Sequence, residues 1–189
     1  MADFSAARLN MVESQVRPSD VTDIRIHDAM RTIPRETFVP QGKAHLAYAD
    51  ASVEYAPGRF LLNPRAVAKL LQLAEPVQGE RALAISAPYA AAVLQYCGVA
   101  VTAHDGQDLC ALPGKDYDLI VVEGAVARVP PQWLEALAPE GRLAVIERHG
   151  PMGRACLFIK HADGIGHRIG FDAAPPVLAG FEAEPVFTF

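Results

Sequence analysis

Three short apolar segments of the chain are each followed directly by side chains that could hold a small ligand. The segments are 82–85, 99–103 and 118–122, and the residues that follow them are Ser86 and Ala87, His104 and Asp105, and Glu123 and Gly124. Ligands of open α/β sheets collect at the carboxyl ends of the strands. If the three segments are parallel strands, a hydroxyl, an imidazole and two carboxylates lie at one edge of a sheet. Such an edge could bind a small polar molecule.

A structural role is the simpler explanation for some of these residues. Asp105 precedes Gly106, a pattern typical of a turn. Gly124 suits a tight bend after a strand. Ser86 lacks the flanking glycines of the Gly-x-Ser-x-Gly motif of hydrolases. No Cys-x-x-Cys or His-x-x-x-His spacing occurs, so we expect no metal site.

The order of the predicted elements indicates an α/β fold. Helical spacing and proline and glycine signals predict helices over 66–74, 88–97 and 131–137, and apolar runs predict strands over 82–85, 99–103, 118–122 and 142–146. Apolar strands that alternate with helices are typical of a mostly parallel sheet with both faces covered. Segments 155–159 and 167–171 predict an antiparallel hairpin at the sheet edge. Residues 1–64 are expected to form a helical and irregular lead-in, packed on an α/β domain of residues 65–189.

Composition excludes several classes of protein. The chain has 189 residues, 51% of them hydrophobic, which is enough to bury a core, and 17 Lys and Arg against 22 Asp and Glu, which disfavours binding to nucleic acid. No apolar run approaches 18 residues, so no membrane association is expected. The three cysteines are widely spaced among apolar residues, as expected of reduced thiols. These features predict a cytoplasmic location.

Particular stretches of sequence point to a known family. They are residues 11–17, 25–30, 33–40 and 47–50 in the first half, and 117–122 and 139–143 in the second. Together they resemble the protein-L-isoaspartate O-methyltransferase family, whose members repair isomerised aspartates with S-adenosylmethionine. The similarity covers most of the chain and is most specific up to Pro40. It implies the Rossmann-like fold of class I methyltransferases.

The segment that corresponds to the family's cofactor loop departs from the family pattern. Family members have an acidic residue and then a glycine-rich turn after the first strand, where bare backbone approaches the cofactor. Here Ala84 stands in place of the acidic residue, no glycine occurs between Arg81 and Cys97, and the turn is about three residues shorter. The family also needs an acidic residue for the ribose hydroxyls, and Asp105 is the candidate. Pro88 and Tyr89 leave little room for a methionine moiety.

Two further departures concern a strand and the substrate loop. Only residues 104–116 separate two strands that a family member connects through a helix and another strand, so an edge strand is expected to be lost. In the loop from Gly58 to Pro64, the family's two hydroxyl positions are Phe60 and Leu62. We therefore predict no catalytic residue with confidence, and expect Phe60, Leu62 and Tyr89 to approach or fill the cofactor's place.

Three hypotheses follow for function. The first is a protein of this family that has lost S-adenosylmethionine binding and methyl transfer and acts as a binding or scaffold module, with no cofactor. The second is an active protein-L-isoaspartate O-methyltransferase with an atypical S-adenosylmethionine site. The third is a small-ligand site around His104, Asp105 and Glu123, with Ser86, Ala87 and Gly124 as remnants of the cofactor cleft. The partner is an unknown protein or an isoaspartyl-containing peptide, and the lost edge strand leaves a homo-oligomer possible.

Overall fold

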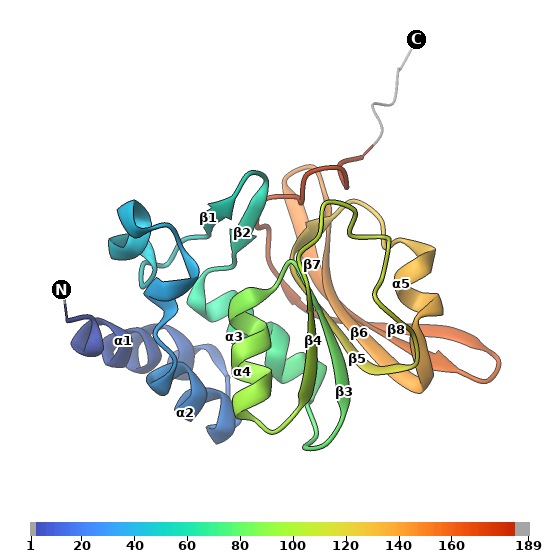
Figure 1. Cartoon of the computed structure of the whole chain (residues 1–189), viewed down its shortest axis with the longest axis horizontal. Coiled ribbons are helices and arrows are strands. Elements are labelled where there is room, and N and C mark those ends of the chain that lie inside the picture. Colours follow the sequence, from blue (N-terminus) through green and yellow to red (C-terminus); the bar gives the residue numbers. More distant parts are fainter. Residues whose placement is uncertain (1–2, 184–189) are drawn as a thin grey trace, which may run out of the picture.

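The computed structural model describes residues 3–183 and shows an α/β sandwich with a helical N-terminal part (Figure 1). The N-terminal part consists of α1 (Ser5–Met11), which continues into a π-helical turn over Val12–Val16, then α2 (Ile24–Thr32) and short 3₁₀ segments at Arg35–Phe38 and Gln41–Leu46. Asp23 begins α2 by accepting a hydrogen bond from the Arg25 amide at 2.9 Å, as an N-cap does. The helix ends before Pro34, which cannot continue it.

A six-stranded sheet forms the centre of the molecule in the order β4-β3-β5-β6-β7-β8. The strands are β3 (Arg81–Ile85), β4 (Ala100–His104), β5 (Tyr117–Val126), β6 (Leu137–His149), β7 (Met152–His161) and β8 (Gly164–Asp172). The first four in the spatial order are parallel, and β7 and β8 are antiparallel to their neighbours. The predicted parallel sheet and C-terminal hairpin are confirmed.

Helices cover the sheet on both faces (Figure 1). These are α3 (Pro64–Ala74), α4 (Pro88–Tyr96) and α5 (Pro131–Glu135). Asn63 caps α3 by accepting a hydrogen bond from the Ala66 amide at 2.7 Å, and Pro64 occupies the first helical position. Because both faces are covered, the central strands β3 and β5 are almost entirely buried, which accounts for their continuous apolar sequences.

Strand β4 is the edge of the sheet. Residues 105–116 lead from β4 to β5 and contain neither a helix nor a strand, so the expected shortening of this side of the sheet is confirmed. Trp133 fixes the connection from the inside, because its indole nitrogen donates to the Leu109 carbonyl at 2.9 Å and its side chain is fully buried.

Two features lie beyond the predicted elements. A two-stranded hairpin, β1 (Val53–Ala56) and β2 (Arg59–Leu61), occupies the stretch that was expected to be irregular. The segment after β8 packs back over the sheet. Leu178 is fully buried, and Phe181 packs against Trp133 with ring centroids 5.3 Å apart and ring planes tilted by 36°. The aromatic residues Phe187 and Phe189, farther along the chain, lie outside the described residues. No helix of the described part is long and apolar enough to span a bilayer.

Candidate functional site

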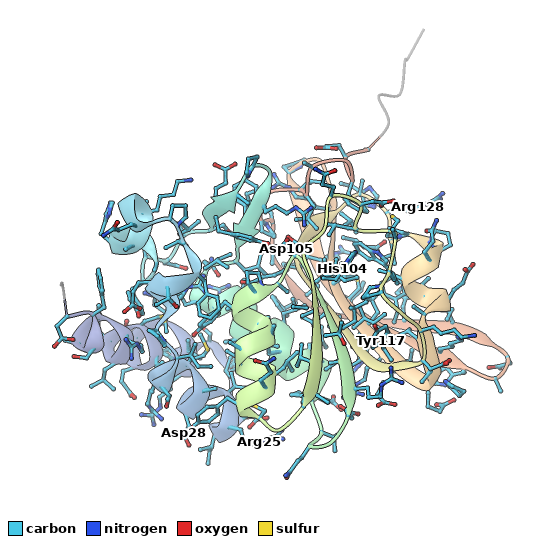
Figure 2. The ribbon with its side chains drawn as sticks, viewed as in Figure 1. Arg25, Asp28, His104, Asp105, Tyr117 and Arg128 are labelled. Carbon is cyan, nitrogen blue, oxygen red and sulfur yellow. The ribbon has the colours of Figure 1, made fainter. Side chains whose placement is uncertain are left out.

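The carboxyl ends of β3, β4 and β5 meet beneath the β1–β2 hairpin, where the sequence predicts a ligand edge. Figure 2 shows His104 and Asp105 at the end of β4, on the side of the sheet where the hairpin lies. Ser86 follows β3 and is fully buried, with a positive φ of 47°. Its amide donates to the His104 carbonyl at 2.9 Å, which ties the two strand ends together.

Side chains of the hairpin bind the polar groups at this edge. The Tyr55 hydroxyl donates to the Asp105 carboxylate at 3.0 Å, and Arg59 donates to the same oxygen at 2.7 Å. The other Arg59 nitrogen donates to the Gly106 carbonyl at 2.6 Å. The Tyr55 oxygen also lies 3.0 Å from the Ser86 hydroxyl. We call these four side chains, Tyr55, Arg59, Ser86 and Asp105, the latch.

The proton positions within the latch follow from the number of donors. Tyr55 has one proton, which goes to the Asp105 carboxylate, so the Ser86 hydroxyl must donate to the Tyr55 oxygen. Burial is the main cause that raises the pKa of Tyr55 above its usual value, so the hydroxyl remains a donor. The Arg59 side chain is only 15% exposed, because its guanidinium is held between Asp105 and the Gly106 carbonyl. Besides preceding a turn, Asp105 therefore binds the β1–β2 hairpin through its carboxylate.

A buried carboxylate holds the second half of the hairpin. Glu123 in β5 is fully buried and accepts hydrogen bonds from the Leu62 amide at 3.0 Å and from the Ala90 amide at 3.3 Å. Burial raises the pKa of Glu123 to about 7, although the Arg35 charge and the two amides act in the opposite direction. The carboxylate thus links the loop after β2 to the first turn of α4.

A buried guanidinium lies on the other side of the same loop. Arg35 is fully buried and donates to the Ala47 carbonyl at 2.7 Å and to the Leu62 carbonyl. Its guanidinium carbon lies 4.5 Å from the ring centre of Tyr89, which also packs edge-on against Phe38 at 5.5 Å. The backbone of Leu62 is therefore held on both sides of its α-carbon, the N–H by Glu123 and the carbonyl by Arg35.

Two buried polar atoms beside this loop have no hydrogen-bond partner among the described residues. They are one Arg35 terminal nitrogen and the Tyr89 hydroxyl oxygen. An unpaired buried polar atom costs about 1–3 kcal/mol. The packing of Tyr89 against Arg35 and Phe38 offsets part of this cost through the aromatic contacts.

The structure brings together some of the predicted site residues and separates others. Ser86 and Asp105 share Tyr55, and Glu123 binds the amide of Leu62. Three predicted residues stay outside these contacts: His104 turns its ring to the Asp108 carbonyl at 3.1 Å, Ala87 is the N-cap of α4, and Phe60 is half-buried in β2 opposite Glu54.

Gly124 has a steric role. Its φ is 155°, and a side-chain carbon placed there would lie 2.6 Å from a methyl carbon of Leu178. The close neighbour is therefore the C-terminal segment of the chain itself. The expected tight bend after the strand is wrong, because β5 continues through Gly124 to Val126.

Sequence reasoning missed two of the side chains that matter most. Tyr55 carries no motif, and Arg35 lies in a stretch used only for the family resemblance. One signal was available for Tyr55, since the alternation in Val53-Glu54-Tyr55-Ala56 before Pro57-Gly58 is typical of a short hairpin. No local signal could have identified Arg35 as buried, because arginine is normally exposed.

Comparisons with known proteins agree with this architecture. The family model described as Protein-L-isoaspartate(D-aspartate) O-methyltransferase (PCMT) matches residues 7–97. A protein-L-isoaspartate O-methyltransferase from Methylorubrum extorquens is 31% identical over 170 residues, which cover 76% of this chain and 75% of the relative. Protein-L-isoaspartate O-methyltransferase 1 of Rhodopseudomonas palustris is 32% identical over 170 residues, with 75% and 69% covered.

Solved structures give the same fold. A putative Plasmodium falciparum protein-L-isoaspartate O-methyltransferase in complex with S-adenosyl-L-homocysteine superposes with a TM-score of 0.70 at 15% identity, covering 94% of this chain and 99% of that one. Another structure of a protein-L-isoaspartate O-methyltransferase has a TM-score of 0.68 at 19% identity, and this chain covers 66% of it. From the sequence relatives and this shared fold, the chain belongs to the protein-L-isoaspartate O-methyltransferase family.

Proposed function

We propose that this protein is a member of the family that no longer binds S-adenosylmethionine or transfers methyl groups, and that it acts as a binding module on the methyltransferase scaffold. The observation that carries the proposal is the latch. The Asp105 carboxylate, the candidate for the ribose hydroxyls, already accepts from Tyr55 and Arg59 at 3.0 and 2.7 Å. Both contacts are made to one oxygen, Oδ1, so a ribose hydroxyl that binds this oxygen would have to displace Tyr55 and Arg59.

The remaining contacts of the cofactor do not fit the residues present either. The turn after β3 consists of buried Ser86 and Ala87, and Tyr89 fills the start of α4 with a fully buried ring. Backbone can approach a ligand closely where side chains are missing, as at glycine, and this turn has none. The methionine moiety would compete for space with the aromatic ring and with the loop that Glu123 and Arg35 hold in place.

The substrate loop supports the same proposal. Methyl transfer to a carboxylate depends on holding donor and acceptor in line, and a site without positioning groups loses most of the available acceleration. The two positions where the family has hydroxyls are Phe60 and Leu62, and Leu62 is fully buried. The described loop therefore presents no hydroxyl at either position to an isoaspartyl substrate.

Calorimetric titration tests the proposal. Titration of the protein with S-adenosylmethionine, and separately with S-adenosyl-L-homocysteine, should give only heat of dilution. Incubation of the protein with S-adenosylmethionine and an isoaspartyl peptide should yield no methyl ester. The Methylorubrum extorquens relative, measured in parallel, is the positive control for the assays. Micromolar binding of either nucleoside by this protein would refute the proposal and would favour an active enzyme with an atypical site.

A double variant tests whether the latch alone prevents S-adenosylmethionine from binding. The double substitution Tyr55→Phe and Arg59→Ala removes every donor that the hairpin gives to Asp105. If the latch alone excludes the cofactor, this variant should gain detectable nucleoside binding. If the turn after β3 is also incompatible, it should remain silent, which is the outcome we expect because the glycines are absent.

A further inference from the structure

Strand β4 leaves one side of the parallel sheet without a neighbour (Figure 1). It pairs with β3 on its inner side, and no strand within residues 3–183 pairs with its outer side. The connection that follows it, residues 105–116, contains no helix or strand that would cover this edge. Ala100, Thr102 and Ala103 are exposed, so the edge is open to solvent.

The hydrogen bonds to β3 identify the backbone groups of β4 that point outward. The Ala100 amide donates at 2.8 Å to the carbonyl just before β3, and the His104 carbonyl accepts at 2.9 Å from the amide just after β3. In a parallel pair, alternate residues direct both of their backbone groups to the same neighbouring strand. Ala100, Thr102 and His104 therefore face β3, whereas the N–H and C=O groups of Val101 and Ala103 face away from the sheet.

These four outward groups have no other partner in the part of the chain that the structure describes. No loop backbone or side chain there forms a hydrogen bond with Val101 or Ala103. The residue before the strand differs, because the Val99 amide donates to the Leu94 carbonyl at 3.1 Å. The unpaired part of the edge is therefore centred on Thr102.

Strand β4 also lacks the features that protect a sheet edge from another chain. Its sequence, Ala-Val-Thr-Ala-His, has no lysine, arginine, acidic residue or proline, and its pairing with β3 is regular throughout. The opposite edge, β8, carries exposed Arg168 and has an irregular register with β7. Because charges and bulges on an edge strand discourage pairing with other chains, β4 is the less protected edge.

Two copies of the β4 edge are complementary to each other. When Thr102 of one copy lies opposite Thr102 of a second copy in antiparallel orientation, each Val101 lies opposite Ala103 of the other copy. The outward groups of these residues then form four hydrogen bonds, which use all four groups of each chain. A register shifted by one residue places outward groups opposite inward ones and forms none. The facing side chains are small and uncharged, so nothing opposes the close approach.

We propose that the protein associates as a two-fold symmetric dimer in which the two β4 strands pair in antiparallel orientation about Thr102 and join the two sheets into one. A two-fold arrangement uses the same surface on both chains and is therefore closed at two copies. A five-residue strand gives less contact than a standard interface, so we expect half-association at about 10–100 µM. The inference goes beyond the proposed function and does not depend on loss of the cofactor.

Sedimentation velocity of the natural full chain at about 5–300 µM tests the association. The protein should change from monomer to dimer across this range, and a single monomeric species throughout would overturn the proposal. Thr102→Glu places two carboxylates opposite each other and should raise the dissociation constant at least tenfold. Ile165→Glu adds the same charge to β8 and should leave association unchanged. If Ile165→Glu dissociates the dimer and Thr102→Glu does not, the assigned edge is wrong.

Disulfide formation tests the register. Both cysteine variants are made with Cys110→Ser, because the other two natural cysteines are buried. The Cα atoms of two facing residues at position 102 would be about 4.5 Å apart, within the range of disulfides. Those at position 103 would be about 8 Å apart, which is too far.

Thr102→Cys should therefore form a covalent dimer on mild oxidation at least fivefold faster than Ala103→Cys. Circular dichroism checks that both variants keep the natural fold. Equal rates in the two variants would mean random collision and would contradict the assigned register. The two proposals fail separately, because nucleoside titrations decide the loss of the cofactor and sedimentation decides this inference.

Discussion

Replacing Glu123 with glutamine should change how the stability of the fold depends on pH. Glu123 is fully buried, and burial raises its pKa from 4.5 to about 7. A carboxyl whose pKa is higher in the folded state binds its proton more tightly there, so its contribution to stability is greatest below pH 4.5. That contribution is lost as the pH rises through the range between the two values.

The magnitude follows from the difference between the two pKa values. A difference of about 2.5 corresponds to about 3 kcal/mol of folding free energy once the pH is well above 7. Most of this loss falls between pH 5 and pH 8. Glutamine cannot ionise, so the variant lacks this loss. Its amide nitrogen meets the Ala90 N–H, which removes a hydrogen bond at a pH-independent cost of about 1 kcal/mol.

Urea denaturation at pH 5, 6, 7 and 8 measures the effect, with the fluorescence of Trp133, the one tryptophan in the chain, as the signal. The natural protein and the variant should be about equally stable at pH 5, and the natural protein should be less stable by about 2 kcal/mol at pH 8. Glu135→Gln makes the same replacement at an exposed position and should keep the natural pH dependence. Identical pH profiles for the natural protein and Glu123→Gln would refute the argument, because they would mean that Glu123 ionises in the fold as it does in water.

Two further predictions concern the hairpin and the C-terminal segment. Arg59→Ala removes the hydrogen bonds to Asp105 and Gly106, so it should lower the free energy of unfolding by about 1–2 kcal/mol. It should also speed amide hydrogen exchange in residues 53–61. Unchanged exchange in these residues would show that the latch does not hold the hairpin. Gly124→Ala should cost about 2 kcal/mol or more, measured by thermal unfolding, because of its φ of 155° and the nearby Leu178 side chain. Gly79→Ala is the matched control, because Gly79 also has a positive φ, of 87°, but has open space around it. This variant should lose only about 1 kcal/mol of stability. Equal losses in the two variants would contradict the steric explanation.

The loop after β2 is held in place by buried polar side chains of the chain itself. The backbone of Leu62 is held between Glu123 and Arg35, two groups of opposite charge that are both fully buried. Each side chain is tied to the loop by its own hydrogen bonds, Glu123 to the Leu62 amide and Arg35 to the Ala47 and Leu62 carbonyls. These two side chains therefore have a structural role that does not require a ligand.

The amino-acid sequence determined the architecture and most of its departures from the family. Apolar runs and helix caps are local patterns, so they predicted the parallel strands, the covering helices and the C-terminal hairpin. The shortened connection between β4 and β5 is a matter of chain length, and 13 residues from His104 to Asp116 cannot hold a helix and a strand. The missing glycines of the cofactor turn could likewise be found by inspection of the sequence.

Only the tertiary structure decided which groups meet at the carboxyl edge. Tyr55 and Arg59 reach Asp105 across 50 and 46 residues of chain, and Leu62 reaches Glu123 across 61. No local pattern specifies such pairs, because they depend on how the hairpin packs on the ends of three strands. The same holds for Arg35, whose burial depends on the carbonyls and the aromatic ring that surround it. Local periodicity encodes the elements, whereas the partners of long polar side chains are fixed when those elements pack together.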